Sequence, residues 1–210
     1  MIHARGLLLA DGPSDVPLGA HVAALARAHG VDLDVVTPEF DRMDDPPGRG
    51  VPARLNCVLA FDSDFQVLLV HRDTEGMDVT QRYSEIVDGM TQCEISWPFV
   101  PIIPIRMTEA WLLLDESAIR SVAGHPSGTM SLGLPAANKV ESLPDPKATL
   151  QEALRTASGC SGRRLQKFRR DFPEHRRQLL ERLDRTGTVR QLSAWTALEQ
   201  ATELAAASLN

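Results

Sequence analysis

Four acidic residues follow predicted strands of this chain at the points where those strands end. Asp11 and Asp15 follow the first apolar run, and Asp73 and Glu75 follow the third. The carboxyl ends of parallel strands meet at one edge of a sheet, so we expect these acids to gather there. Gathered carboxylates raise one another's pKa unless a cation joins them, and they suit Mg²⁺ or Mn²⁺. Such ions activate water and polarise phosphates, so the pattern indicates phosphoryl chemistry.

Each of these acids also has a simpler interpretation. Asp73 and Glu75 could form an ordinary solvated turn after a strand. Asp15 could be the N-cap of a helix. Glu109, which follows the fourth apolar run, could be a first-turn acid stabilised by the helix dipole. The hypothesis of a metal site therefore rests on the combination of these acids and not on any one of them.

Alternating strand and helix patterns run through the first 124 residues. Apolar runs between turn residues predict strands, and apolar residues spaced by three and four predict helices. We expect strands at residues 7–10, 31–40, 65–71 and 99–105 and helices at 17–29, 51–60, 78–90 and 108–124. Pro101 and Pro104 favour an edge or irregular position for the last strand. The alternation predicts an α/β fold whose four-stranded, mainly parallel sheet is flanked by helices.

The strand signals stop after Gly124. A stretch rich in turn residues follows, and helical patterns then cover residues 147–157, 163–185 and 188–208. We therefore expect an α/β domain over residues 1–124 and a loop-plus-helix C-terminal extension over residues 125–210 that packs on it.

The charge of the chain is unevenly distributed. The formal net charge is −6, yet residues 161–190 carry ten basic and four acidic residues, which leaves −12 on the remainder. A basic surface neutralises phosphates without reading sequence, so this segment and Arg72 are candidates for nucleic-acid binding. The candidates in the segment are Arg163, Arg164, Lys167, Arg169 and Arg170. The competing interpretation is a solvated helical face balanced by the acidic body.

The remaining composition is typical of a soluble protein. Hydrophobic residues make up 43% of the 210 residues, and the three cysteines lack any zinc-binding spacing. We expect a cytoplasmic protein, because three distant cysteines fit a reducing compartment. No stretch approaches the roughly 20 apolar residues of a membrane span, and the apolar start is too short for a signal peptide.

The order of these motifs resembles a known family. "LLLADGPSD" at residues 7–15 and "VLLVHRDTEG" at 67–76 resemble the Toprim domain of primases, topoisomerases and overcoming-lysogenisation-defect nucleases. "PIIPIRMTEAWLLLDESAI" at 101–119 and "LPDPKATLQEAL" at 143–154 are similar to one bacterial Toprim-like branch, often encoded beside ATPases in defence or mobile regions. The resemblance covers roughly residues 5–155 and implies a Toprim-like (Rossmann-like) sheet whose acids hold Mg²⁺.

The resemblance carries over residue by residue, with two departures. Asp11 stands where the family usually has Glu, and Glu75 stands where the second Asp of Asp-x-Asp is usual. The two changes are opposite in length, so they could compensate, or they could mark a weakened site. Asp15 matches the family pattern. Glu109 and Lys147 match the branch's motifs, and a lysine near such a site could stabilise phosphate charge; Lys147 could equally be a solvated first-turn residue.

A second Asp-x-Asp motif competes with this reading. Asp62 and Asp64 follow an apolar stretch, as in haloacid-dehalogenase-like phosphatases. Residues 51–60 read as a helix, however, which would put these acids before the third strand and at the wrong edge of the sheet. His71 could serve as a general base, although a single histidine at a strand end is more often structural.

These features together predict a metal-dependent nuclease that hydrolyses phosphodiester bonds of DNA or RNA. Asp11, Asp15, Asp73 and Glu75 are the expected metal ligands, with Glu109 and Lys147 as further catalytic residues. We expect nucleic acid as the substrate and leave an ATPase partner and a homodimer open. The alternatives are a non-catalytic regulatory or adaptor subunit with decayed ligands, and a small-molecule phosphatase.

Overall fold

The structure of the chain, a computed structural model, describes residues 1–209 and contains two compact units. Unit 1 comprises residues 1–103 and 197–210, and unit 2 comprises residues 104–196. The boundary therefore lies at residue 103 and not at the expected residue 124, and the end of the chain returns to the first unit. No helix in the described part of the chain is long and apolar enough to cross a membrane.

Unit 1 is built on one parallel sheet. Its strands are β1 (Ile2–Leu9), β2 (Val31–Val36), β3 (Val67–His71) and β4 (Phe99–Ile102), in the spatial order β2-β1-β3-β4. Each neighbouring pair is parallel. The predicted α/β class with a four-stranded parallel sheet is confirmed, and Pro101 does lie in an edge strand, where a missing N–H is tolerated.

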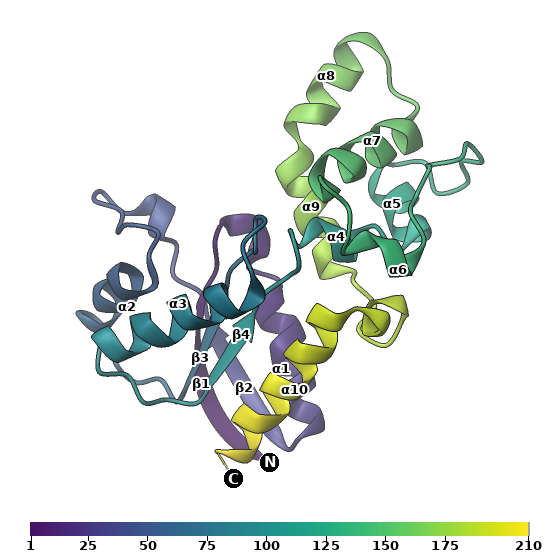
Figure 1. Cartoon of the computed structure of the whole chain (residues 1–210). Helices are drawn as coiled ribbons and strands as arrows, with labels where there is room; N and C mark the ends of the chain where they lie inside the picture. The colour runs from purple at the N-terminus through teal and green to yellow at the C-terminus, as the bar shows by residue number, and fades with distance from the viewer. Residues whose placement is uncertain (210) are drawn as a thin grey trace. The chain divides into compact units, whose positions relative to one another are not determined.

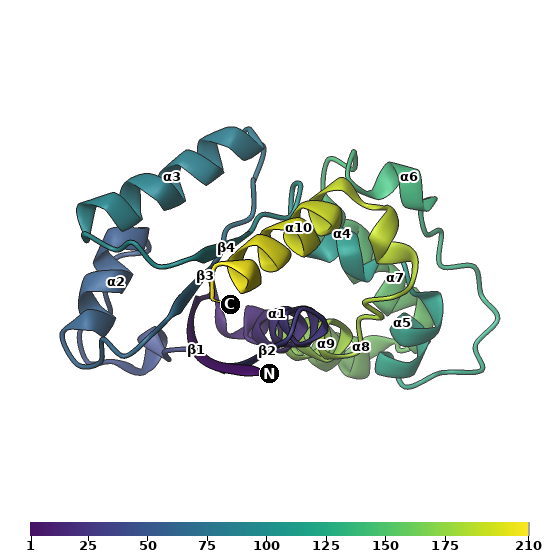
Figure 2. The same ribbon diagram turned by 90° about the horizontal axis from the view of Figure 1, so that it is seen from below.

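Helices cover both faces of this sheet, as Figures 1 and 2 show. The helices α2 (Val51–Leu59) and α3 (Val79–Gln92) lie on one face, and α1 (Leu18–Ala28) lies on the other. Residues 197–207 of α10 (Ser193–Ala207) belong to unit 1 and lie on the α1 side. Two short 3₁₀ turns, η1 (Pro13–Asp15) and η2 (Phe40–Arg42), complete the connections.

The strands are apolar on both faces because both faces are covered. Leu7 and Leu9 of β1 pack with α2 and α3 in the main core, while Leu8, the residue between them, is buried toward Gly19 of α1. Every residue of β3 is buried. An apolar run with no polar alternation thus specifies a central strand of a doubly covered sheet.

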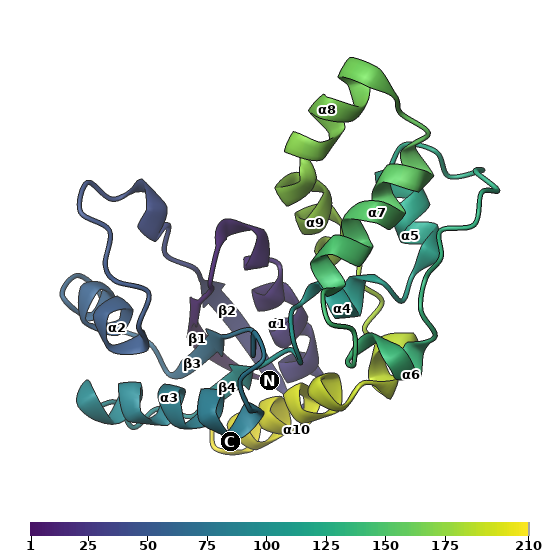
Figure 3. The same ribbon diagram turned by 45° about the horizontal axis from the view of Figure 1, so that its top comes forward.

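Unit 2 is helical, as Figure 3 shows. Its elements are α4 (Glu109–Leu112), α5 (Glu116–Val122), α6 (Ala137–Val140), α7 (Pro146–Ser158), α8 (Gly162–Arg170), α9 (Phe172–Glu181), η3 (Thr188–Gln191) and the start of α10. Both α4 and α5 pack against α7 and α9. Trp111 and Trp195 are fully buried and meet edge to face, with ring centroids 5.2 Å apart. This packing explains why residues 104–124 belong to unit 2 and not to the sheet.

Two predicted helices are each broken in the structure. The expected helix at 108–124 is split into α4 and α5, because Asp115 accepts a hydrogen bond from the Ala118 N–H at 2.9 Å and starts a new helix. The expected helix at 163–185 is split into α8 and α9 at Asp171, since Pro173 occupies the first turn of α9. Proline is accepted in a first turn but not in a helix interior.

Candidate functional site: the carboxylate edge

The winding direction of the sheet reverses between β1 and β3. The chain leaves β1 toward β2 on one side and then crosses to β3 on the other side. Ligands of open parallel sheets bind outside the carboxyl ends of the strands at such a switch point. Leu9 of β1 lies opposite Val70 of β3, so the segments that follow these residues leave the sheet side by side. We call the charged residues of these segments and their α3 partners the carboxylate edge.

His71 is the most buried charged group of the carboxylate edge. Its Nε2 lies 3.3 Å from Asp73 Oδ1 and its Nδ1 lies 3.7 Å from Asp15 Oδ2. Burial alone would lower the pKa of His71, but the charge of Asp15 and the hydrogen bond and charge of Asp73 outweigh it and raise the pKa to about 9. At neutral pH the imidazolium therefore holds the acid that follows β1 to the acid that follows β3.

Arg72 is the second cation of the edge and faces a different pair of acids. Its Nη1 donates to Asp11 Oδ1 at 2.5 Å, and its Nη2 lies 3.1 Å from Glu85 of α3. The same Nη2 also donates to the main-chain carbonyl of Arg49. Asp11 keeps 32% of its side chain exposed, so this pair is open to solvent on one side.

Arg82 extends the network along α3. Its guanidinium lies 2.7 Å from Glu85 and 3.5 Å from Glu75, and its Nε donates to the Asp73 carbonyl at 2.9 Å. Glu75 is 65% exposed and has a φ of 50°, a left-handed conformation that costs energy for a residue with a Cβ. Backbone strain of this kind is found more often at functional sites than elsewhere.

Arg54 stabilises the main chain at the end of β1. It is buried in α2, donates to the Ala10 carbonyl at 2.5 Å and lies over the Phe40 ring. Burial lowers the pKa of Arg54, and the charge of Asp11 opposes that change. Arg54 thereby fixes the end of β1 from which Asp11 projects.

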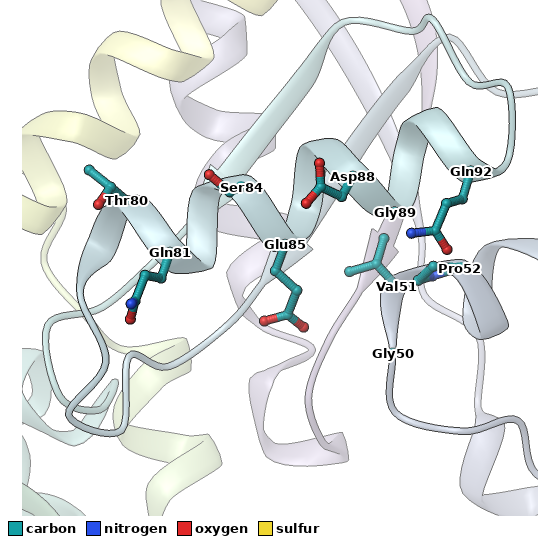
Figure 4. A pocket seen from close by; sticks show the side chains of 10 residues that line it. All are labelled: Gly50, Val51, Pro52, Thr80, Gln81, Ser84, Glu85, Asp88, Gly89 and Gln92. Carbon is teal, nitrogen blue, oxygen red and sulfur yellow. The ribbon is translucent and has the colours of Figure 1, made fainter.

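An open groove of about 550 Å³ borders the edge between the start of α2 and the face of α3. Figure 4 shows the groove, with Glu85 and Gln81 projecting from the same side of α3. Gly50 and Val51 form the opposite wall. Because Glu85 also pairs with Arg72, the groove is continuous with the charged network.

The sequence did not single out Glu85 and Arg54 as site residues. The spacing of Arg82 and Glu85 by three residues on one helix was an available signal for a pair on α3. No comparable signal marked Arg54, whose partners are main-chain carbonyls 43 and 44 residues away.

The donor chemistry of the edge suits Mg²⁺ or Mn²⁺, since Asp11, Asp73 and Glu75 offer hard oxygen ligands. The positions of these acids are less favourable for a metal ion than their chemistry. Within residues 1–209, no group of three or more His, Cys, Asp or Glu side chains is placed to hold a metal ion. Arg72 binds Asp11, and His71 lies between Asp15 and Asp73. A divalent ion at this edge would therefore compete with the protein's own cations.

The remaining predicted site residues belong to unit 2. Glu109 is buried and forms an ion pair with Arg176 at 3.0 Å. Lys147 is exposed in the first turn of α7. The five predicted nucleic-acid contacts are exposed on α8, namely Arg163, Arg164, Lys167, Arg169 and Arg170. Arg72 alone of the predicted nucleic-acid contacts lies at the carboxylate edge.

The rival acids Asp62 and Asp64 lie just before β3, at the opposite edge of the sheet. Asp62 pairs with Arg5 of β1 at 2.7 Å, and the Asp64 N–H donates to the Asp62 carboxylate at 3.1 Å. These acids stabilise the turn into β3. They are separated from the acids that follow β1 and β3 by the length of the strands, which disfavours a shared phosphatase site.

No family model, curated protein or solved structure matches this chain. The assignment of a function therefore rests on the geometry of the carboxylate edge and on the resemblance of its motifs.

Proposed function

We propose that the carboxylate edge hydrolyses phosphodiester bonds of DNA or RNA with the help of Mg²⁺ or Mn²⁺. One observation carries the proposal. The acids after β1 and the acids after β3 meet at the switch point of the sheet, where ligands of this architecture bind. An ordinary solvated turn does not require a buried Asp15 and a half-buried Asp73 on the two sides of a buried His71.

The residues of the edge have separate roles in this proposal. Asp11, Asp73 and Glu75 would have to leave their present partners and come together to hold the ion, which supplies an activated water and offsets phosphate charge when bound. His71 positions Asp73 and Asp15 and holds its proton at neutral pH. Arg72 and Arg82 are the cations nearest these acids, and a guanidinium can grip a phosphate with two parallel N–H groups.

Plasmid cleavage tests the proposal directly. Purified protein is incubated with supercoiled plasmid or single-stranded RNA in Mg²⁺, Mn²⁺ or EDTA, beside Asp73→Asn. We expect metal-dependent cleavage that Asp73→Asn lowers by at least 100-fold, because that variant removes one ligand charge without changing side-chain size. The matched control is Asp62→Asn, which removes an equivalent charge at the opposite edge and should cleave normally. Equal cleavage by both variants would contradict the site.

A non-catalytic regulatory subunit is the second candidate, and one observation favours it. The acids of the edge are already engaged by Arg72, Arg82 and His71, so much of their charge is offset without a metal. In that case the nucleic acid would bind without being cut, and an ATPase partner, which the motifs' resemblance suggests, would supply the activity.

Metal binding separates the two candidates. A ligand that binds only the folded state raises the melting temperature, so a metal-binding edge predicts a rise with millimolar Mn²⁺. Arg72→Gln removes the cation that competes for Asp11, and the nuclease proposal expects it to tighten Mn²⁺ binding while slowing cleavage. A melting temperature that Mn²⁺ leaves unchanged in both proteins would favour the regulatory subunit.

A further inference from the structure

A second hollow lies within unit 2. It encloses about 290 Å³ between α7, α8 and α9. This is near the lower end of the roughly 300–1,000 Å³ range of small-molecule sites, so it suits a single flat ring system. Its walls combine aromatic and polar side chains, namely Phe168, Phe172, His175, Gln151, Glu152, Arg155 and Arg169.

The aromatic wall is already arranged for stacking. The rings of Phe168 and His175 are 4.2 Å apart between centroids and inclined by 31°. Phe172 is buried beside them, whereas Phe168 is only partly buried. A planar ligand that enters the hollow would therefore meet an ordered aromatic surface and not a flexible side chain.

His175 is the polar member of this aromatic wall. Its Nδ1 is buried and has no hydrogen-bond partner among residues 1–209. Burial lowers the pKa of His175, although Asp171 and Glu174 oppose that change. A neutral imidazole carries one donor and one acceptor, and a buried polar atom without a partner is costly. A ligand in the hollow removes that cost only if the ring turns so that Nδ1 faces it.

Both charges occur around the hollow: Glu152 lies in its wall, Asp171 and Glu174 lie near His175, and the cations are concentrated on α8. No residue of α8 is buried, and five of its exposed side chains are cations: Arg163, Arg164, Lys167, Arg169 and Arg170. Arg169 belongs both to this set and to the wall of the hollow. Arg155, in contrast, is already paired with Glu152. The free charge therefore lies on the α8 side, where a phosphate chain would run.

We propose that the hollow between α7, α8 and α9 binds an unpaired base of single-stranded nucleic acid, while the cations of α8 hold the adjoining phosphates. Aromatic platforms beside a basic track bind single strands in this way without reading sequence. A duplex keeps its bases inside the stack, so the hollow selects single-stranded or unpaired segments. The site goes beyond the proposed hydrolysis and does not require the carboxylate edge to be active.

Fluorescence anisotropy in EDTA tests this site, because EDTA prevents any cleavage. Labelled single-stranded DNA and RNA of the same sequence are compared with a duplex and with an oligonucleotide that contains abasic positions. We expect the intact single strands to bind tightest and Phe168→Ala to weaken them by about 5- to 150-fold, the range of one stacking contact. Phe168→Tyr, which keeps an aromatic ring, should restore binding.

Two controls make the result decisive. Phe61→Ala removes a phenylalanine that is 86% exposed in unit 1 and should not change binding. An oligonucleotide with 2-aminopurine reports stacking directly, and its fluorescence should fall on binding to the parent protein but not to Phe168→Ala. Equal affinity for intact and abasic strands would overturn the proposal. Failure of every oligonucleotide to bind would also overturn it and would point to an acidic protein as the partner of α8.

Discussion

At the scale of single residues, the carboxylate edge is a set of acids held by cations of the same chain. His71 pairs with Asp15 and Asp73, and Arg72 pairs with Asp11 and Glu85. Buried charges of this kind are stable only when they are paired. The exposed members of the edge are therefore the ones free to change partners when a ligand arrives.

The stability of the protein should depend on pH through His71. Its folded pKa of about 9 is above the ordinary value of 6.5, so its contribution is complete below pH 6.5 and is lost as the pH rises through 9. The shift corresponds to about 3 kcal/mol of unfolding free energy. Urea denaturation between pH 6 and pH 10 measures this loss, and His71→Gln should flatten the curve in that window.

A direct titration checks the same prediction without a variant. The imidazole proton resonances of His71 in the parent protein should titrate near pH 9 in NMR spectra. A midpoint at or below pH 6.5 would show that Asp15 and Asp73 do not hold the imidazolium as described.

The strained backbone of Glu75 predicts a trade between stability and activity. Glycine adopts a positive φ without the Cβ clash, so Glu75→Gly should raise the unfolding free energy by about 1 kcal/mol or less. The lost pair with Arg82 matters little to stability because Glu75 is 65% exposed. If Glu75 is a ligand, metal-dependent cleavage should fall in the same variant.

Glu94 offers a matched control for that experiment. It also has a positive φ, of 57°, and lies in the loop after α3. Glu94→Gly should give a similar gain in stability in urea denaturation and leave cleavage unchanged. Loss of cleavage in both variants would mean that the effect comes from loop flexibility and not from the Glu75 carboxylate.

At the scale of elements, the site depends on how closely α2 and α3 approach each other. A Cβ on Gly89 of α3 would lie 2.7 Å from the Cβ of Val51 in α2, which is too close for real atoms. The glycine therefore lets α3 pack against the start of α2, and this contact sets the position of Glu85 beside Arg72.

Gly89→Ala should accordingly destabilise the protein. Overpacking in a closed contact costs about 1–3 kcal/mol, and the better helix propensity of alanine recovers only part of it. Asp88→Ala is the matched control, because Asp88 is the exposed neighbour on the same helix. Chemical denaturation that finds both variants equally stable would show that the two helices separate without cost.

At the scale of the whole molecule, the acidic candidate site and the basic surface belong to different units. The sheet unit carries the acids of the carboxylate edge, and the helical unit carries the basic residues of α8. Phosphate contacts bind nucleic acid without reading sequence and release counterions as they form. The division predicts that affinity and cleavage can be changed separately.

Replacing Arg163, Arg164 and Lys167 with alanine tests this separation. For a single strand, the slope of log affinity against log salt should fall in size by about 2, because each phosphate contact contributes about 0.7. Anisotropy at several salt concentrations measures the slope. The matched control replaces Arg27, Arg42 and Arg177, each of which is paired with a carboxylate of its own. An equal change of slope in both triple variants would refute a specific role for α8.

The sequence by itself determined the class of the fold and the location of the acids. Doubly apolar runs specify covered parallel strands, Pro101 marks the edge strand, and acids after strands must lie at the carboxyl ends. The helical spacing of apolar residues predicted two helices that are too long. Asp115 and Pro173 each start a new helix inside a stretch whose spacing is continuous.

Only the tertiary structure decided what neutralises those acids and which unit each helix joins. Arg72 and Asp11 are 61 residues apart in the chain, and Glu85 reaches Arg72 from another element. Such pairs depend on strand register and helix approach, which no local spacing encodes. The same holds for Trp111, which packs on Trp195 and so places residues 104–124 with the helices. The sequence orders the candidate ligands along the chain, and packing selects their partners.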